Sequence, residues 1–245
     1  EVAWTYSLRS FNNAEDPNPN SQITPIVVSN VMYLSTVDSI VALDPQLGTE
    51  LWRHPVETGR PSRRGVAYWG GNDKLGPRII FTAGSQLTAL SALSGDKDAS
   101  FGDNGVIDIG IPYISVPLIY KDLIIVGANT PPGTRGGIGN PRAFSAIDGT
   151  KIWEFNSVPV AGEIGHDSWE GMSWENRLGA NAWPFYFTVD TDKDFLYLPL
   201  ASPLPFAFGG DRAGDNLFAN SIVAVDIHSG EYRWHFQTIH HDLWD

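Results

Sequence analysis

Six residues at the end of the sequence bring together side chains that perform acid–base and metal chemistry. The segment HHDLWD covers residues 240–245 and holds two imidazoles, two carboxylates and an indole. An imidazole exchanges protons near neutral pH, and a carboxylate can act as a general base or bind a cation. The segment is therefore open to three interpretations: a solvated end, a metal site, or part of an active site.

A hydrolytic zinc centre is one alternative for these histidines. Adjacent side chains on a strand point to opposite faces, so we expect that His240 and His241 do not share one metal. A catalytic zinc needs three protein ligands, and His166 is the candidate for the third. The alternative that we favour places one histidine toward the site, where it orients Asp245 or contacts substrate, and the other in sheet packing.

The composition argues against several classes of partner and site. The chain has 245 residues, a net charge of −12 and no run of Lys or Arg, which argues against a phosphate-backbone binding surface. It has no cysteine, so disulfides and thiolate metal sites are excluded. No apolar stretch approaches the ~20 residues that span a bilayer.

A repeated pattern runs along the chain and must position any site. In three segments a β-rich run ends at a turn glycine, and a tryptophan follows four residues later, giving the pairs Gly48/Trp52, Gly149/Trp153 and Gly230/Trp234. A fourth segment has Gly95 but carries Ala99 at the tryptophan position, so we expect Phe101 to replace the indole. Trp4 would be the same residue from a preceding copy. Each copy is typical of a hairpin whose aromatic residue packs between neighbouring sheets.

Further hairpins lie between these turns, and nothing in the sequence has a convincing helical period. We therefore predict an all-β chain in which four antiparallel strands form each repeat, the length of a β-propeller blade. About four blades fit residues 1–245 as one propeller domain, with an insertion over residues 158–183 before the inner strands of the fourth blade. Four blades could form a small closed propeller or half of a large one. A β-sandwich would not explain the recurring Gly-x-x-x-Trp.

Several motifs together resemble one enzyme family. The blade ends, RRGVAYW (63–69), GANAW (179–183) and HHDLWD (240–245) are similar to the PQQ-dependent quinoprotein dehydrogenases, which are eight-bladed propellers. The double histidine, and the absence of a cysteine pair before the Arg-Gly, resemble the membrane-type glucose (aldose) dehydrogenases. The resemblance implies that this chain is the N-terminal half of the propeller.

The resemblance gives roles to particular residues. Asp245 would be the general base that takes the proton of the substrate hydroxyl as hydride passes to PQQ. Trp183 would be the stacking surface under PQQ, because an indole offers a large π-face. Arg64 would pair with a PQQ carboxylate, a partner that suits a guanidinium fork, although Arg63 could take that role instead.

The expected calcium ligands depart from those of the alcohol-oxidising relatives, which use a Glu, an Asn and the general-base Asp. Ser202 stands at the Asn position, and the region of the Glu has no acid but contains Asn129, which we assign to cofactor binding. The metal would then be held by Asp245, Ser202 and backbone carbonyls. By the same resemblance Arg60 would lie over the other face of PQQ.

At the substrate, the resemblance and the HHDLWD motif assign His241 and Trp244. The implied function is a PQQ- and Ca²⁺-dependent dehydrogenase that oxidises an aldose or polyol, with Ca²⁺ as the Lewis acid. Electrons would pass to ubiquinone or a cytochrome c in the periplasm, and any membrane association would come from segments outside this sequence.

Half a propeller exposes sheet edges, so we expect it to pair with the remaining half or with a second copy, and to be inactive alone. The competing hypothesis is a cofactor-free propeller of PQQ-like repeats that acts as a protein-binding scaffold.

Overall fold

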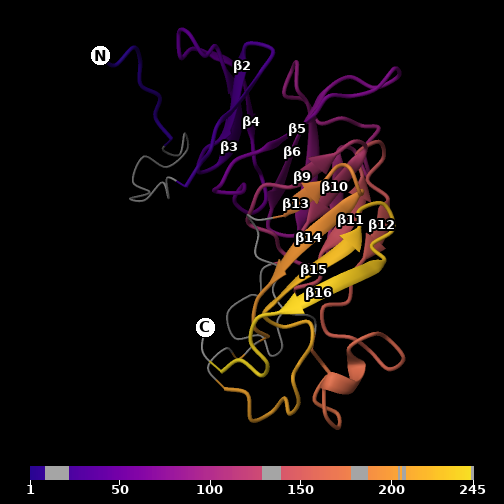
Figure 1. The fold of residues 1–245 in the computed structure, drawn as a ribbon. Helices are drawn as coiled ribbons and strands as arrows, with labels where there is room; N and C mark the ends of the chain where they lie inside the picture. The colour runs from indigo at the N-terminus through magenta and orange to yellow at the C-terminus, as the bar shows by residue number, and fades with distance from the viewer. Residues whose placement is uncertain (9–21, 129–138, 178–186, 204, 206–207, 244–245) are drawn as a thin grey trace. The chain divides into compact units, whose positions relative to one another are not determined.

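The computed structural model describes residues 1–8, 22–128, 139–177, 187–203, 205 and 208–243, and these form an all-β structure (Figure 1). The described strands make four antiparallel sheets, and in each sheet four strands follow one another in chain order. The predicted fold class of four-stranded antiparallel blades is therefore confirmed. By internal packing the chain divides into two compact units, residues 1–124 with 145–150, and residues 125–144 with 151–245.

The strand bounds follow the chain. The first sheet contains β1 (Ile26–Val28), β2 (Val31–Ser35), β3 (Ser39–Leu43) and β4 (Glu50–Pro55), and the second contains β5 (Ala67–Trp69), β6 (Arg78–Ala83), β7 (Gln86–Ser91) and β8 (Val106–Asp108). The third contains β9 (Leu118–Tyr120), β10 (Leu123–Val126), β11 (Arg142–Ser145) and β12 (Lys151–Glu154), and the fourth contains β13 (Thr188–Asp190), β14 (Phe195–Leu200), β15 (Ser221–Asp226) and β16 (Tyr232–Gln237).

The first hairpin shows how the sequence sets these strands. β1 and β2 pair antiparallel around Ser29 and Asn30, whose φ angles are 49° and 62°. Two positive φ angles give a turn whose twist matches that of the flanking strands, and asparagine tolerates this conformation well. This hairpin is one of those expected between the repeat turns, and Ser29 and Asn30 form its turn.

The repeated tryptophans pack onto the turn glycine of the following repeat. Trp52 covers Gly95, where a β-carbon would lie 2.5 Å from the indole Cε3, and Trp4 and Trp153 cover Gly48 and Gly230 in the same way. Each indole N–H donates to a backbone carbonyl near that glycine, at 3.1 Å for Trp4 to Pro45, 3.0 Å for Trp52 to Ala92 and 2.9 Å for Trp153 to Ile227. Only glycine leaves room for this contact, which explains the pairing of the two residue types.

Phe101 takes the place of the missing tryptophan in the second repeat, as predicted. Its ring is fully buried, and its Cζ lies 3.2 Å from the position of a β-carbon on Gly149. A phenyl ring has no N–H, so this copy keeps the packing and loses the hydrogen bond.

A second feature repeats with the tryptophans. Trp52, Trp153 and Trp234 each pair across the sheet with an alanine, namely Ala42, Ala143 and Ala224, and the strand register shifts directly after that alanine. A β-bulge sharpens the local twist of a strand pair. At Trp52 and Trp153 the small alanine and the bulge therefore help to turn the large indole toward the turn glycine of the following repeat.

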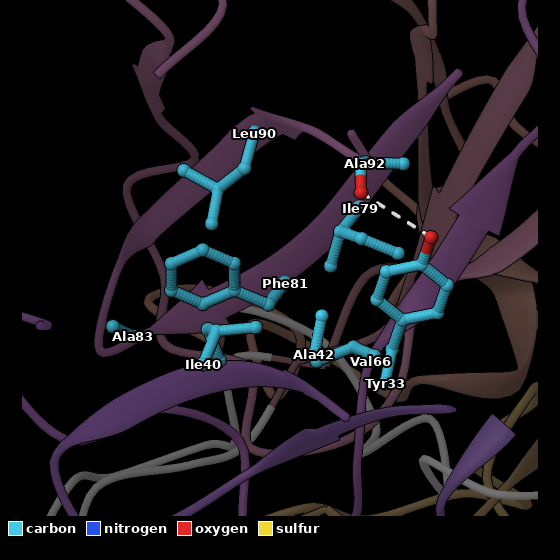
Figure 2. Packing of buried hydrophobic residues seen from close by; sticks show 9 residues of the cluster. All are labelled: Tyr33, Ile40, Ala42, Val66, Ile79, Phe81, Ala83, Leu90 and Ala92. Atoms are coloured by element: carbon cyan, nitrogen blue, oxygen red, sulfur yellow. Dashed lines mark hydrogen bonds between the residues drawn. The ribbon is translucent and has the colours of Figure 1, made fainter. Parts of the chain in front are cut away.

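The core of the first unit lies between the first two sheets (Figure 2). Its buried residues are Tyr33, Ile40, Ala42, Val66, Ile79, Phe81, Ala83, Leu90 and Ala92. Inside this apolar cluster the Tyr33 hydroxyl donates to the Ala92 carbonyl at 3.2 Å, the same carbonyl that accepts from Trp52. The Ala92 carbonyl oxygen thus accepts two hydrogen bonds, which compensates for its burial away from water.

The insertion expected over residues 158–183 is described as far as residue 177. It contains the short 3₁₀ helix η1 (His166–Ser168) followed by the buried Trp169 (Figure 1). The Trp169 indole donates to the Leu217 carbonyl, and the Ser168 hydroxyl accepts from the Leu217 N–H at 2.8 Å. The insertion is therefore fastened to the loop between β14 and β15. Among the described helices none is long enough to cross a bilayer.

Candidate functional site

The loop between β4 and β5, residues 56–66, carries the predicted cofactor ligand Arg64. Ser62 ties this loop down, because its N–H donates to the Thr82 carbonyl at 2.8 Å and its hydroxyl to the Ile114 carbonyl at 3.2 Å. The Ser35 hydroxyl donates to the Ser62 carbonyl at 2.6 Å. Both neighbouring sheets thus fix the backbone from which Arg64 projects.

Gly65 explains why an arginine is followed by glycine here. Its φ is +126°, and a β-carbon would lie 2.6 Å from the Thr24 carbonyl oxygen. On the other side of the same residue, the Thr24 N–H donates to the Arg64 carbonyl at 3.1 Å. A larger residue would push the loop away from Thr24, so the Arg-Gly pair is a backbone requirement of this loop.

The three arginines of the loop differ in burial. Arg64 is half-buried, whereas Arg60 and Arg63 are exposed. A half-buried guanidinium on a fixed backbone is better prepared to hold a carboxylate than an exposed one. The choice of Arg64 over Arg63 is consistent with this difference, and the assignment of Arg60 to the cofactor stays a prediction.

The conformation of the C-terminal segment differs from the one expected. β16 ends at Gln237, and residues 238–241 form bends, so the premise that His240 and His241 lie on a strand is wrong. His241 has a φ of 54°, and its Nδ1 lies 2.7 Å from the Gly214 carbonyl, to which it can only donate. His240 is exposed. The two imidazoles are separated by this bend and not by strand alternation.

Ser202 and Asp242 meet in the second unit. Ser202 is fully buried, and its hydroxyl donates to Asp242 Oδ2 at 2.6 Å. Asn220 Nδ2 donates to the same oxygen at 2.9 Å. Sequence reasoning named Ser202 and overlooked Asp242 and Asn220 as its partners. The sequence feature that could have pointed to Asp242 is its position as the first carboxylate of the HHDLWD motif.

The metal assignment stays a prediction. In the described ranges no three or more His, Cys, Asp or Glu side chains gather in a way that could hold an ion. Four predicted site residues lie outside the described residues: Asn129, Trp183, Trp244 and Asp245. Arg60 and Arg64 belong to the first compact unit, and Ser202 and His241 to the second.

Among the described residues, one cavity in each unit can be named, and neither involves a predicted site residue. The first, of about 490 Å³, is lined by apolar, polar and charged residues of the first two sheets and their loops, among them His54, Lys97 and Asp103. Burial lowers the pKa of His54. The second, of about 360 Å³, is lined by Phe155, Phe218 and other residues of the second unit.

Comparison with known proteins places the fold and the motifs in one group. The family model described as "Glucose/ethanol/alcohol dehydrogenase, beta-propeller domain" matches residues 1–245. The chain is 28% identical to a quinohemoprotein alcohol dehydrogenase of Comamonas testosteroni over 272 residues, and 28% identical to a quinoprotein glucose dehydrogenase of Gluconobacter oxydans over 283 residues. It is 26% identical to a quinate/shikimate dehydrogenase (quinone) of Acinetobacter baylyi.

A solved structure supports the same fold. The crystal structure of quinohemoprotein alcohol dehydrogenase from Comamonas testosteroni superposes with a TM-score of 0.79 at 23% identity, covering 100% of this chain and 38% of that one. The chain likewise covers 36% of the Comamonas sequence and 34% of the Gluconobacter sequence, so it spans about a third of these relatives. Because the family model matches all 245 residues, the chain belongs to the PQQ-dependent dehydrogenase family, within its β-propeller domain.

Proposed function

We propose that the protein containing this chain is a PQQ-dependent dehydrogenase that oxidises an aldose or a polyol. The observation that carries the proposal is the match of the whole chain to the propeller domain of this family. It is supported by a loop that holds the arginine of the Arg-Gly motif on a backbone in which only glycine can follow. When bound, PQQ supplies an ortho-quinone that accepts hydride from the substrate carbon.

The chain's own residues would bind and orient the reactants. Arg64 would form paired hydrogen bonds with a carboxylate of PQQ, a task that suits a half-buried guanidinium. Trp183 would lie under the flat cofactor. Asp245 would accept the proton of the substrate hydroxyl, with His241 and Trp244 beside the substrate.

Among the described residues, no three or more His, Cys, Asp or Glu side chains gather to hold the calcium ion that the family implies. The hydroxyl of Ser202 is hydrogen-bonded to Asp242, and no group of three acidic or histidine side chains surrounds it there. Calcium takes ~6–8 oxygen ligands, so the ion would depend on Asp245 and on oxygens of PQQ itself. We therefore assign no step of the reaction to the metal.

The choice of substrate rests on the double histidine and on the absence of a cysteine pair before the Arg-Gly motif, both of which resemble the glucose-type enzymes. The relatives named for alcohol, glucose and quinate define the panel to be tested. Ubiquinone or a cytochrome c in the periplasm is the electron acceptor that we propose with this assignment.

The test uses the full-length apoprotein, to which PQQ and Ca²⁺ are added before dye-linked oxidation is measured on aldoses, polyols, primary alcohols and quinate. We expect turnover to require PQQ and to be fastest with an aldose or a polyol. Faster turnover of a primary alcohol or quinate would overturn the substrate assignment. A protein that binds no PQQ by absorbance would overturn the function and favour the cofactor-free scaffold.

Two neighbouring arginines provide a matched pair for the same experiment. Arg64→Ala should weaken PQQ binding by at least about 10-fold, because a charged bidentate pair contributes about 1.5–3 kcal/mol. Arg63→Ala removes the same charge from the adjacent exposed position and should bind PQQ as the wild type does. Equal effects of the two substitutions would reject Arg64 as the specific ligand.

A further inference from the structure

The second unit contains a buried polar cluster that the proposed chemistry does not use. At its centre is Asp242, which is 6% exposed and whose Oδ2 accepts from Ser202 and Asn220 at 2.6 and 2.9 Å. The Ser202 hydroxyl also lies 3.0 Å from Asn220 Oδ1, so the three side chains form one closed group. Buried carboxylates are rare, and this one is stabilised by two donors from the ends of two neighbouring strands.

The backbone of Asp242 is fixed as well. The fully buried Arg212 donates from Nη2 to the Asp242 carbonyl and from Nη1 to Asn216 Oδ1, the latter at 2.6 Å. Asn216 returns a hydrogen bond to the Arg212 carbonyl at 2.8 Å. A guanidinium is costly to bury. The burial of Arg212 against the carbonyl of Asp242 therefore indicates that the position of the segment around residue 242 matters.

The neighbouring residue is held by the same loop. His241 donates to the Gly214 carbonyl and adopts a left-handed backbone conformation. That loop is in turn fastened to the insertion through Trp169 and Ser168. A chain of contacts therefore runs from the insertion through the loop to residues 241 and 242.

The cluster is organised as an anchor and not as a metal site. Its carboxylate oxygen is occupied by two hydrogen-bond donors, and a 2.6 Å contact between oxygens leaves no space for an ion between Ser202 and Asp242. Calcium–oxygen distances are about 2.3–2.6 Å, which would separate two ligand oxygens further. The function of this cluster must therefore be sought in the segment that it holds.

We propose that Asp242 is a positioning residue that fixes the segment leading to Asp245. The proposal rests on the proposed function, in which Asp245 is the general base. Three residues of chain reach at most ~10 Å, so a fixed residue 242 limits where the carboxylate of residue 245 can lie. A reacting group displaced by about 1 Å can lose about 100-fold in rate, so loosening the anchor would slow the chemical step.

The test compares Asp242→Asn, Asp242→Ala and Ser202→Ala in the full-length holoenzyme. Asp242→Ala should lower kcat at least 10-fold while KM and PQQ affinity change less than 3-fold. Asp242→Asn keeps an acceptor oxygen and should retain more turnover than Asp242→Ala. The double variant of Ser202→Ala and Asp242→Ala should be no slower than Asp242→Ala alone, because both remove one anchor. Asp215→Ala, an exposed carboxylate of the same loop, is the control.

Hydrogen exchange gives a readout that does not require activity. Backbone amides of residues 241–243 should exchange at least 10-fold faster in Asp242→Ala than in wild type or Asp215→Ala. Unchanged exchange, or unchanged kcat in both Asp242 variants, would overturn the positioning role. So would a parallel loss of kcat, PQQ binding and melting temperature, which would indicate a general structural role. A wild-type holoenzyme without turnover would reject the proposed function itself.

Discussion

Trp52 covers the turn glycine of the next repeat, Gly95, so closely that a β-carbon there would lie 2.5 Å from the indole. The contact joins the two sheets of the first unit at the point where the Trp52 N–H also donates to Ala92. The same arrangement recurs at Trp4 with Gly48 and at Trp153 with Gly230. The repeat therefore requires the glycine and the aromatic residue for the same reason: the ring packs into the space that a side chain at the glycine would fill.

Gly95→Ala should destabilise the protein more than an alanine at another glycine of similar backbone conformation. Gly95 and Gly84 have φ angles of +77° and +60°, but a β-carbon at Gly84 meets nothing within 4 Å. Both substitutions carry the strain of a positive φ, about 1 kcal/mol. Gly95→Ala adds overpacking against Trp52, about 1–3 kcal/mol. Urea unfolding of the full-length variants measures the difference, and equal losses would contradict the proposed role of the contact.

The repeat could be predicted from the sequence because it is local. Gly95 and the residues of its hairpin are close in the chain, and Phe101, two residues beyond the expected tryptophan position, is the nearest following aromatic residue that could replace the indole. The Asp242 cluster could not be predicted in this way. Its donors, Ser202, Asn220 and Arg212, lie 40, 22 and 30 residues away, in loops without periodicity. The bend at residues 238–241 was missed for the same reason, since tertiary hydrogen bonds and not local preference set it.

Gly65→Ala should weaken PQQ binding although the residue has no side chain to contact the cofactor. The added β-carbon would meet the Thr24 carbonyl at 2.6 Å, at a φ of +126° that alanine rarely adopts, and relief requires the loop carrying Arg64 to move. We expect a loss of at least about 10-fold in PQQ affinity, as for removal of a bidentate contact. Titration by absorbance measures it. Gly76→Ala, where a β-carbon meets nothing within 4 Å, should bind PQQ normally. If Gly65→Ala bound PQQ with the same affinity as wild type, the conformation of Gly65 would not be needed for PQQ binding.

Arg78→Met should destabilise the first unit strongly. Arg78 is fully buried and donates to Asp98 at 2.7 Å and to the Ile147 carbonyl at 2.8 Å, and its guanidinium lies 5.0 Å from the centre of the Trp69 ring. Methionine fills part of the volume and leaves these acceptors without their donor, at a cost of about 3–5 kcal/mol. Asp98→Asn keeps Arg78 and its carbonyl partners and should cost less. A loss below about 1 kcal/mol for Arg78→Met, measured by urea unfolding, would show that the buried cation is not needed.

Stability should fall as the pH is lowered from 8 to 5, and His235 should account for part of the change. Burial lowers the pKa of His235, and its Nδ1 lies 2.8 Å from the Tyr232 hydroxyl oxygen, within hydrogen-bond distance. The folded state therefore binds this proton less readily than the unfolded state, whose histidine pKa is about 6.5. The stabilising contribution is complete above that value and is lost as the pH falls through the lower folded-state pKa. His235→Gln should flatten the dependence of the unfolding free energy on pH, whereas His240→Gln, which removes an exposed imidazole, controls for the loss of a histidine. A His235 variant with the wild-type slope between pH 5 and 8 would show that this half-buried imidazole does not couple protonation to folding.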